Sequence, residues 1–224
     1  GHRDSGIFSA TLKNALSECL LRGEQAALLV NRRGSATRVY CRRCGYICKC
    51  IRCNIPIKHL SAGLLQCSLC HSTYPYPKSC PSCLNGSISS LGIGTERVVG
   101  EVNAMFPTAR VTKWDKDTAP NTKTHKLILQ KLINRKTDIL VGTQMMLKGL
   151  NIATITLVGV INTDIGLQST DFRSPERTFQ LLAGIPRHSD DSGNNTTVVI
   201  QTYQPSNHAI LAGARNDYDF FYQT

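Results

Sequence analysis

Four C-x-x-C pairs between residues 41 and 83 constrain the fold more than any other feature of this sequence. They are Cys41/Cys44, Cys50/Cys53, Cys67/Cys70 and Cys80/Cys83. A gap of two residues lets one tight turn direct two sulfur atoms at the same ion, and two such turns supply the four thiolates of a tetrahedral structural zinc site. Four pairs therefore predict two complete zinc sites. Because neither site keeps an open ligand position, we expect a structural role and not hydrolytic catalysis.

The spacing alone leaves the grouping of the pairs open, since sequential, interleaved and nested arrangements use the same residues. Iron held by thiolates in an electron-transfer protein is the main competing interpretation. Disulfide bonds are disfavoured because the first residues, GHRDSG, lack the apolar core of an export signal. In a reducing cytosol, paired cysteines at this spacing indicate metal binding, and we expect a cytoplasmic protein.

Two further cysteines and two histidines fall outside the pairs. Cys19 lies on the apolar face of a predicted helix and is interpreted as a core residue, whereas Cys48 is interpreted as a spare thiol. His59 and His71 lie near the pairs. Because eight cysteines already fill two shells, neither histidine is expected to bind metal.

The charge balance favours a polyanionic partner. The chain has 26 Lys and Arg residues against 15 Asp and Glu residues, a net charge of +11. An excess of this size attracts nucleic acid or an anionic membrane surface, although solvated basic residues are the plain alternative. No apolar run reaches the roughly 18 residues that span a bilayer. Basic residues of the cysteine-rich region either form a nucleic-acid face or balance two dianionic metal centres; they are Arg38, Arg42, Arg43, Lys49, Arg52 and Lys58.

Outside residues 41–87, apolar strands alternate with amphipathic helices. Helices are expected at 7–21, 94–105, 124–136 and 174–184, and strands at 25–34, 109–114, 137–143, 154–164 and 196–203. This alternation predicts an α/β fold with a parallel sheet flanked by helices. The expected division is a discontinuous domain, 1–40 and 88–204, an inserted module, 41–87, and the start of a following segment, 205–224. Because the chain lacks an initiator Met and stops without a polar tail, we expect it to be a piece of a longer protein.

Local signals mark helix ends and one buried helix face. Ser9 is a candidate N-cap of the first helix and Gly23 its candidate stop. Pro175 lies near the first turn of the last helix. In the helix at 124–136, the apolar face is predicted to carry Leu127, Leu129, Leu132 and Ile133.

Five sequence blocks occur in an order that resembles one protein family. They are LLVNRRG, the eight paired cysteines, LGIGTERV, DILVGTQMMLKGLNIATITLVGVINTD and DFRSPERTFQLL. From about Phe8 to Phe221 the chain resembles the family of primosomal replication-restart helicases, PriA. The resemblance implies the second RecA-like motor lobe of a superfamily 2 helicase, with the zinc module inserted after the NRRG strand. It also implies nested zinc sites, one formed by Cys41, Cys44, Cys80 and Cys83 and the other by Cys50, Cys53, Cys67 and Cys70.

The resemblance also implies a function. Relatives of this kind use ATP to move 3′ to 5′ along DNA, recognise stalled or repaired forks and recruit primosome proteins, at the bacterial nucleoid in the cytoplasm. Thr143, Gln144 and Lys148 match a helicase motif at the carboxyl edge of the sheet, and we expect them to contact DNA phosphate. Arg32 and Arg33 are further candidates for contact with DNA or with the zinc module.

The chain departs from the family at the residues that hydrolyse ATP. It has no G-x-x-x-x-G-K-[ST] phosphate loop and no Walker-type acidic motif, so we expect ATP and Mg²⁺ only in a complete helicase with the missing first lobe. Gly149 and Asn151 are expected at the nucleotide, although relatives often carry an acidic residue at position 151. The sixth motif reads QLLAGIPRHSDDSGNN, where Arg187 is the nearest candidate for the arginine finger. The alternative is a non-catalytic zinc-containing module, a degenerate helicase lobe, that binds nucleic acid or proteins.

Overall fold

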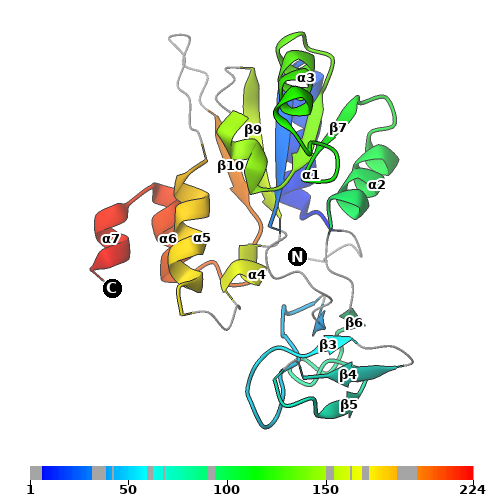
Figure 1. Cartoon of the computed structure of the whole chain (residues 1–224), viewed down its shortest axis with the longest axis vertical. Helices are drawn as coiled ribbons and strands as arrows, with labels where there is room; N and C mark the ends of the chain where they lie inside the picture. Colours follow the sequence, from blue (N-terminus) through cyan, green and yellow to red (C-terminus); the bar gives the residue numbers. More distant parts are fainter. Residues whose placement is uncertain are drawn as a thin grey trace.

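A parallel sheet forms the centre of the larger part of the molecule (Figure 1). The computed structural model describes residues 7–31, 39–41, 43–59, 63–67, 69–89, 94–149, 154–161, 163–167, 172–185 and 196–223. The sheet has the strand order β10-β9-β1-β8-β7, with every neighbouring pair parallel. The strands are β1 (Gln25–Val30), β7 (Val111–Trp114), β8 (Ile139–Gly142), β9 (Ile155–Ile161) and β10 (Thr197–Ile200).

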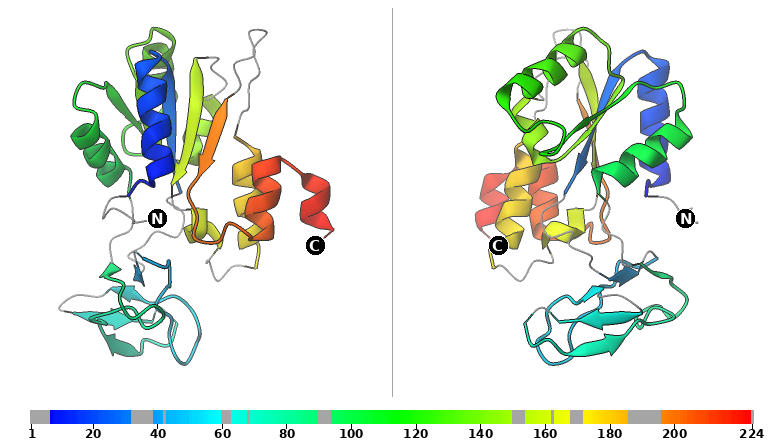
Figure 2. Two further views of the ribbon diagram at one scale, coloured as in Figure 1. Left: turned by 180° about the vertical axis from the view of Figure 1, so that it is seen from behind. Right: turned by 45° about the vertical axis from the view of Figure 1, so that its right-hand side comes forward.

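Helices cover both faces of this sheet (Figure 2). They are α1 (Ala10–Leu21), α2 (Thr95–Met105), α3 (Thr122–Ile133), η1 (Gln144–Gly149), α4 (Thr163–Leu167), α5 (Ser174–Ala183), α6 (His208–Arg215) and α7 (Tyr218–Tyr222). Leu16 of α1 and Val98 of α2 belong to the buried cluster on one face, and Leu132 of α3 and Leu182 of α5 to the cluster on the other. Because both faces are covered, the central strand β1 is buried at every position, which accounts for its continuous apolar sequence. The predicted fold class, a RecA-like parallel sheet flanked by helices, is confirmed.

The local signals for helix ends are also confirmed. Ser9 accepts a hydrogen bond from the backbone N–H of Leu12 and caps α1. Gly23 adopts the left-handed φ of +67° directly after α1, a conformation that glycine adopts without strain. Pro175 lies in the first turn of α5.

The predicted apolar face of α3 is partly wrong. Leu127 and Ile133 are 50% and 61% exposed, whereas Ile128 and Leu132 are the buried residues of the helix. Ile128 and Leu132 are four residues apart and therefore lie on one stripe, which faces the sheet. Leu127 comes one residue before Ile128, and Ile133 comes one residue after Leu132. Because successive residues of a helix are rotated by about 100°, both side chains point away from the stripe and face solvent.

Two helices follow β10 that the sequence analysis did not predict. α6 and α7 pack against α5, where the rings of Phe179 and Phe221 stack at 4.3 Å between centroids. Ala209 and Ala212 of α6 complete this small cluster. The segment after residue 205 therefore covers α5. Within the described residues, no helix has the length and apolar character that a membrane span requires.

The cysteine-rich insertion forms a separate module beyond the carboxyl ends of the strands (Figures 1 and 2). Its base is the antiparallel pair β2 (Tyr40–Cys41) and β6 (Ile88–Ser89). Its body is a three-stranded sheet of β3 (Lys58–His59), β4 (Leu64–Gln66) and β5 (Thr73–Pro75). Because β2 and β6 pair at the two ends of the insertion, the module closes on itself and interrupts the α/β domain at one place.

Candidate metal centres and a pocket at the sheet edge

The outer group of cysteines comes from the two ends of the module. The sulfur atoms of Cys41, Cys44, Cys80 and Cys83 all lie within 4.8 Å of one another. Cys41 Sγ is 3.7 Å from Cys83 Sγ, and Cys44 Sγ is 3.6 Å from Cys80 Sγ. Metal–sulfur bonds of about 2.3 Å in a tetrahedron would place the sulfur atoms about 3.8 Å apart. In a disulfide the two sulfur atoms would be only about 2.05 Å apart. The group therefore fits one tetrahedral metal ion.

The inner group lies between the outer pairs in the sequence. Cys50, Cys53, Cys67 and Cys70 also place their sulfur atoms within 4.8 Å of one another. Cys50 Sγ and Cys70 Sγ are 3.6 Å apart, again close to a tetrahedral edge. The structure thus brings the eight cysteines together in the nested arrangement that the family resemblance implies, and not in a sequential or interleaved one.

Tight turns place the sulfur atoms and stabilise their anionic form. Backbone N–H groups point at sulfur within the turns, from Arg43 to Cys41 Sγ at 3.3 Å and from Leu69 to Cys67 Sγ at 3.4 Å. Hydrogen bonds with Ser72 lower the pKa of Cys70, in the inner group, to about 6, while burial raises the pKa of Cys41, in the outer group, to about 12. Four thiolates repel one another within each group, and a metal ion bound between them would deprotonate the thiols and offset that repulsion.

Gly86 is a residue of the outer group that the sequence analysis missed. A Cβ at this position would lie 2.2 Å from Cys41 Sγ and 2.8 Å from Cys83 Sγ. Its carbonyl oxygen also accepts a hydrogen bond from the N–H of Cys80 at 3.0 Å. A glycine three residues after the last cysteine was the available signal, but sequence alone does not show that sulfur atoms fill the space.

The other cysteines and histidines lie outside both groups. Cys19 of α1 is fully buried in the core, and Cys48 is buried in the small apolar cluster of the module. The ring of His59 packs edge-on against Tyr76. Neither His59 nor His71 joins a group of possible metal ligands among the described residues.

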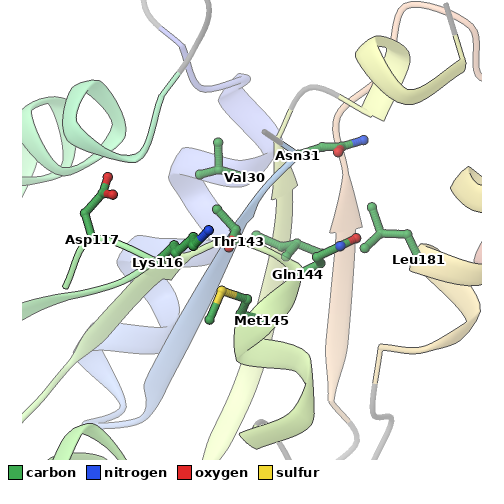
Figure 3. Close-up of a pocket in the computed structure, with 9 residues that line it drawn as sticks. Val30, Asn31, Lys116, Asp117, Thr143, Gln144, Met145 and Leu181 are labelled. Carbon is green, nitrogen blue, oxygen red and sulfur yellow. The ribbon is translucent and has the colours of Figure 1, made fainter. Parts of the chain in front are cut away.

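A pocket of about 320 Å³ lies at the carboxyl edge of the parallel sheet (Figure 3). Side chains from the ends of three neighbouring strands and from the adjoining helices line it. They are Leu29, Val30, Asn31, Lys116, Asp117, Thr143, Gln144, Met145 and Leu181. Open parallel sheets bind their ligands at this edge, because the loops that follow the strands meet there.

The pocket residues are held by close packing of β7 against β8. A Cβ at Gly142 would lie 2.4 Å from the carbonyl oxygen of Trp114, so only glycine fits at the end of β8. The chain then turns at once into η1, with the N–H of Met146 bonded to the carbonyl oxygen of Thr143 at 2.9 Å. Thr143 and Gln144 consequently lie side by side in the wall of the pocket (Figure 3).

A buried carboxylate organises the loop on the opposite side of the pocket. Asp115 accepts hydrogen bonds from Thr95 Oγ1 at 2.7 Å and from the backbone N–H groups of Asp117 and Thr118 at 3.1 and 3.0 Å. Burial alone would raise the pKa of Asp115, but these hydrogen bonds outweigh it and lower the pKa. The ionised Asp115 therefore fixes the turn that carries Lys116 to the pocket, a residue that the sequence analysis did not select.

The remaining predicted site residues are less fully described. Lys148 and Gly149 fall at the end of η1, and their side chains are not described. Arg32, Arg33, Asn151 and Arg187 lie outside the described residues. Of the predicted DNA-contacting and nucleotide-contacting residues, only Thr143 and Gln144 are therefore placed at the pocket.

Fold and site together define a class of protein, an α/β domain with a pocket at its carboxyl edge and an inserted module with two four-cysteine groups. No protein-family model matches the chain. Known relatives are replication restart proteins PriA. The chain is 40% identical to the protein of Bacillus subtilis over 218 residues, 37% to that of Synechocystis over 220 and 33% to that of Treponema pallidum over 221.

These similarities extend over 97%, 96% and 98% of this chain and cover 27%, 26% and 34% of the respective relatives. The chain is thus similar to PriA proteins over nearly its whole length and spans about a third or less of the length of these relatives. Among solved structures, the helicase domain of Hef from Pyrococcus furiosus is similar at a TM-score of 0.38 and 14% identity, over 85% of this chain and 24% of that one.

Proposed function

We propose that this chain is the second motor lobe of an ATP-dependent 3′-to-5′ DNA helicase of replication restart. The observation that carries the proposal is the pocket at the carboxyl edge, where Thr143 and Gln144 present a hydroxyl and an amide beside Lys116 (Figure 3). These three side chains suit the oxygen atoms of a DNA phosphate. The family relationship and the net charge of +11 support the same partner.

The other site residues take the roles that the family pattern suggests. Lys148, Arg32 and Arg33 would add contacts to DNA. Gly149 and Asn151 would lie at the nucleotide, and Arg187 would be the arginine finger. ATP and Mg²⁺ would bind only with a first lobe, because the phosphate loop belongs to that lobe. We further propose that primosome proteins are partners, that the protein acts at the bacterial nucleoid, and that the lobe comprises 1–40 and 88–204, interrupted by the module at 41–87.

We propose that each cysteine group holds one zinc ion. The outer ion would be held by Cys41, Cys44, Cys80 and Cys83 and the inner ion by Cys50, Cys53, Cys67 and Cys70, in line with the sulfur separations of 3.6 to 3.7 Å. When bound, zinc cross-links two turns and leaves no open position for a substrate. Elemental analysis of protein purified without added metal should give two zinc ions per chain. Iron bound by thiolates would instead colour the protein.

Gly86→Ala should weaken zinc binding at the outer group by about 10–100-fold, the usual effect of a change directly behind metal ligands. The reason is that the added methyl group would lie 2.2 Å from Cys41 Sγ. Competition with a chromogenic chelator measures the change. Gly63→Ala is the control in the same module: its φ of +75° strains an alanine, but nothing lies within 4 Å of its Cβ position, so zinc binding at the outer group should be unchanged. Equal affinities in both variants would contradict the placement of the outer site.

Lys116→Ala should reduce the dependence of single-stranded DNA binding on salt by about 0.7 in the slope of log K against log salt concentration, the loss of one phosphate contact. Gln144→Ala should weaken binding by about 2–10-fold on any sequence, since it removes a neutral hydrogen bond. Fluorescence anisotropy at several salt concentrations measures both. Lys131→Ala, in the last turn of α3 at the opposite edge of the sheet, is the control. If it lowers the slope as much as Lys116→Ala does, the pocket is not the DNA site.

A further inference from the structure

The metal module touches the α/β domain at a glycine of its outer metal-binding turn. Gly45 follows Cys44 directly, and its N–H bonds to the carbonyl oxygen of Cys41 at 3.0 Å. A Cβ at position 45 would lie 2.5 Å from Cγ and 2.7 Å from Cδ2 of Tyr203. The ring of Tyr203 therefore lies directly against the backbone of the turn that carries two of the outer cysteines.

Tyr203 is in turn fixed to the domain by a buried carboxylate. Asp164, in the first turn of α4 just after β9, is only 7% exposed. Its Oδ1 and Oδ2 accept the backbone N–H of Tyr203 at 3.1 and 3.0 Å, and Oδ1 also accepts Thr202 Oγ1–H at 2.8 Å. A buried carboxylate with these donors is held strongly, because leaving it unpaired would be costly. The segment after β10 is thus pinned to the carboxyl edge of the sheet.

The connectivity explains why such a contact matters. The module is joined to the domain by two chain crossings that meet at the β2–β6 pair. Two crossings at one place define a hinge, about which the module would be free to swing. A further contact that does not run through the two crossings restricts that freedom, and Tyr203 against Gly45, in the turn that follows β2, supplies it.

We propose that Tyr203, seated on Gly45 and anchored by Asp164, is the positioning residue that sets the orientation of the metal module relative to the carboxyl edge of the sheet. The outer metal ion shapes the turn that Tyr203 contacts, so loss of that ion also releases the module. While this contact holds, a DNA strand bound at the pocket meets the module at a single fixed angle. The orientation itself does not depend on the proposed helicase function.

Distance measurement between two spin labels tests this inference on the whole chain. The labels replace Lys58 in β3 and Leu127 in α3, both exposed, and are attached to ketone-bearing amino acids so that the ten cysteines are left untouched. Pulsed electron resonance should find a single narrow distance in the parent chain. Tyr203→Ala and Gly45→Ala should lose that narrow peak, whereas Tyr203→Phe, which keeps the ring, should retain it.

Gly63→Ala separates loss of the contact from backbone strain. Gly63 has a φ of +75°, nearly that of Gly45 at +76°, but nothing lies within 4 Å of its Cβ position. It should therefore keep the narrow distance. Gly45→Ala could broaden the distance simply by losing zinc. Tyr203→Ala should keep the zinc content of the parent chain, so it is the decisive variant if Gly45→Ala loses zinc. A narrow distance in folded Tyr203→Ala, or equal broadening in Gly63→Ala, overturns the proposal. Because no DNA or ATP is involved, either result is independent of the proposed helicase function.

Discussion

Removal of the two proposed zinc ions should unfold the inserted module and leave the α/β domain folded. A structural zinc site contributes about 10–16 kcal/mol to the folding of a small domain. Besides cysteines, the buried apolar residues of the module's cluster are Val39, Ile57 and Leu65. Three such side chains contribute about 5–9 kcal/mol, far less than the backbone entropy of about 1–2 kcal/mol per residue that the module loses on folding.

Amide hydrogen exchange after treatment with a strong chelator measures this effect. Exchange should rise throughout residues 39–89, while β1 and β9 keep the protection that the buried sheet gives them. Cys41→Ala should act likewise on the module. Cys48→Ala is the matched control, because Cys48 is equally buried but belongs to neither group, and it should cost only about 1 kcal/mol. Loss of the whole far-ultraviolet circular dichroism signal on chelation would contradict a self-contained module.

Trp114→Ala should destabilise the α/β domain by about 3–5 kcal/mol, the usual cost of truncating a buried aromatic side chain. Trp114 is 2% exposed at the end of β7, and its Nε1–H donates to His125 Nδ1 at 2.9 Å. The substitution therefore leaves both a cavity and an unpaired nitrogen. Urea denaturation followed by circular dichroism measures the change, since Trp114 is the only tryptophan.

Leu127→Ala is the control for this substitution. Leu127 is half exposed, and surface changes of this kind usually stay within about 0.5 kcal/mol. It also tests the corrected face of α3. A loss at Leu127 comparable to that at Trp114 would show that the outer side of α3 is buried, as the sequence pattern had suggested.

Sequence reasoning succeeded where one local pattern determines the structure. The apolar run of β1 predicts a strand covered on both faces, and Ser9 and Gly23 mark the ends of α1 through their own backbone and side-chain chemistry. The spacing of the cysteines predicts two four-thiolate groups. Their nested grouping follows from the family resemblance and not from spacing, since every grouping satisfies the same local turn geometry.

It failed where the decisive contact joins distant parts of the chain. In α3 both Leu127 and Ile128 are apolar, and only the angle at which the helix packs on the sheet determines which one is buried. Lys116 lies at the pocket because Thr95, 20 residues earlier in the chain than Asp115, donates a hydrogen bond to Asp115 and so fixes the loop that carries Lys116. Tyr203 meets Gly45 across two separate folding units, and no periodicity of either segment indicates that contact.

The central claim, that this chain is one lobe of a two-lobe DNA motor, is tested most directly by measuring ATP hydrolysis with and without single-stranded DNA. The isolated chain should hydrolyse no ATP, because it carries no phosphate loop. Joined to the first lobe of a PriA protein, it should hydrolyse ATP slowly and only with DNA, and restoring the arginine finger in the sixth motif should raise the rate by about 10³–10⁵. DNA-stimulated hydrolysis by the isolated chain, or a folded and restored fusion that stays inactive, would contradict the account.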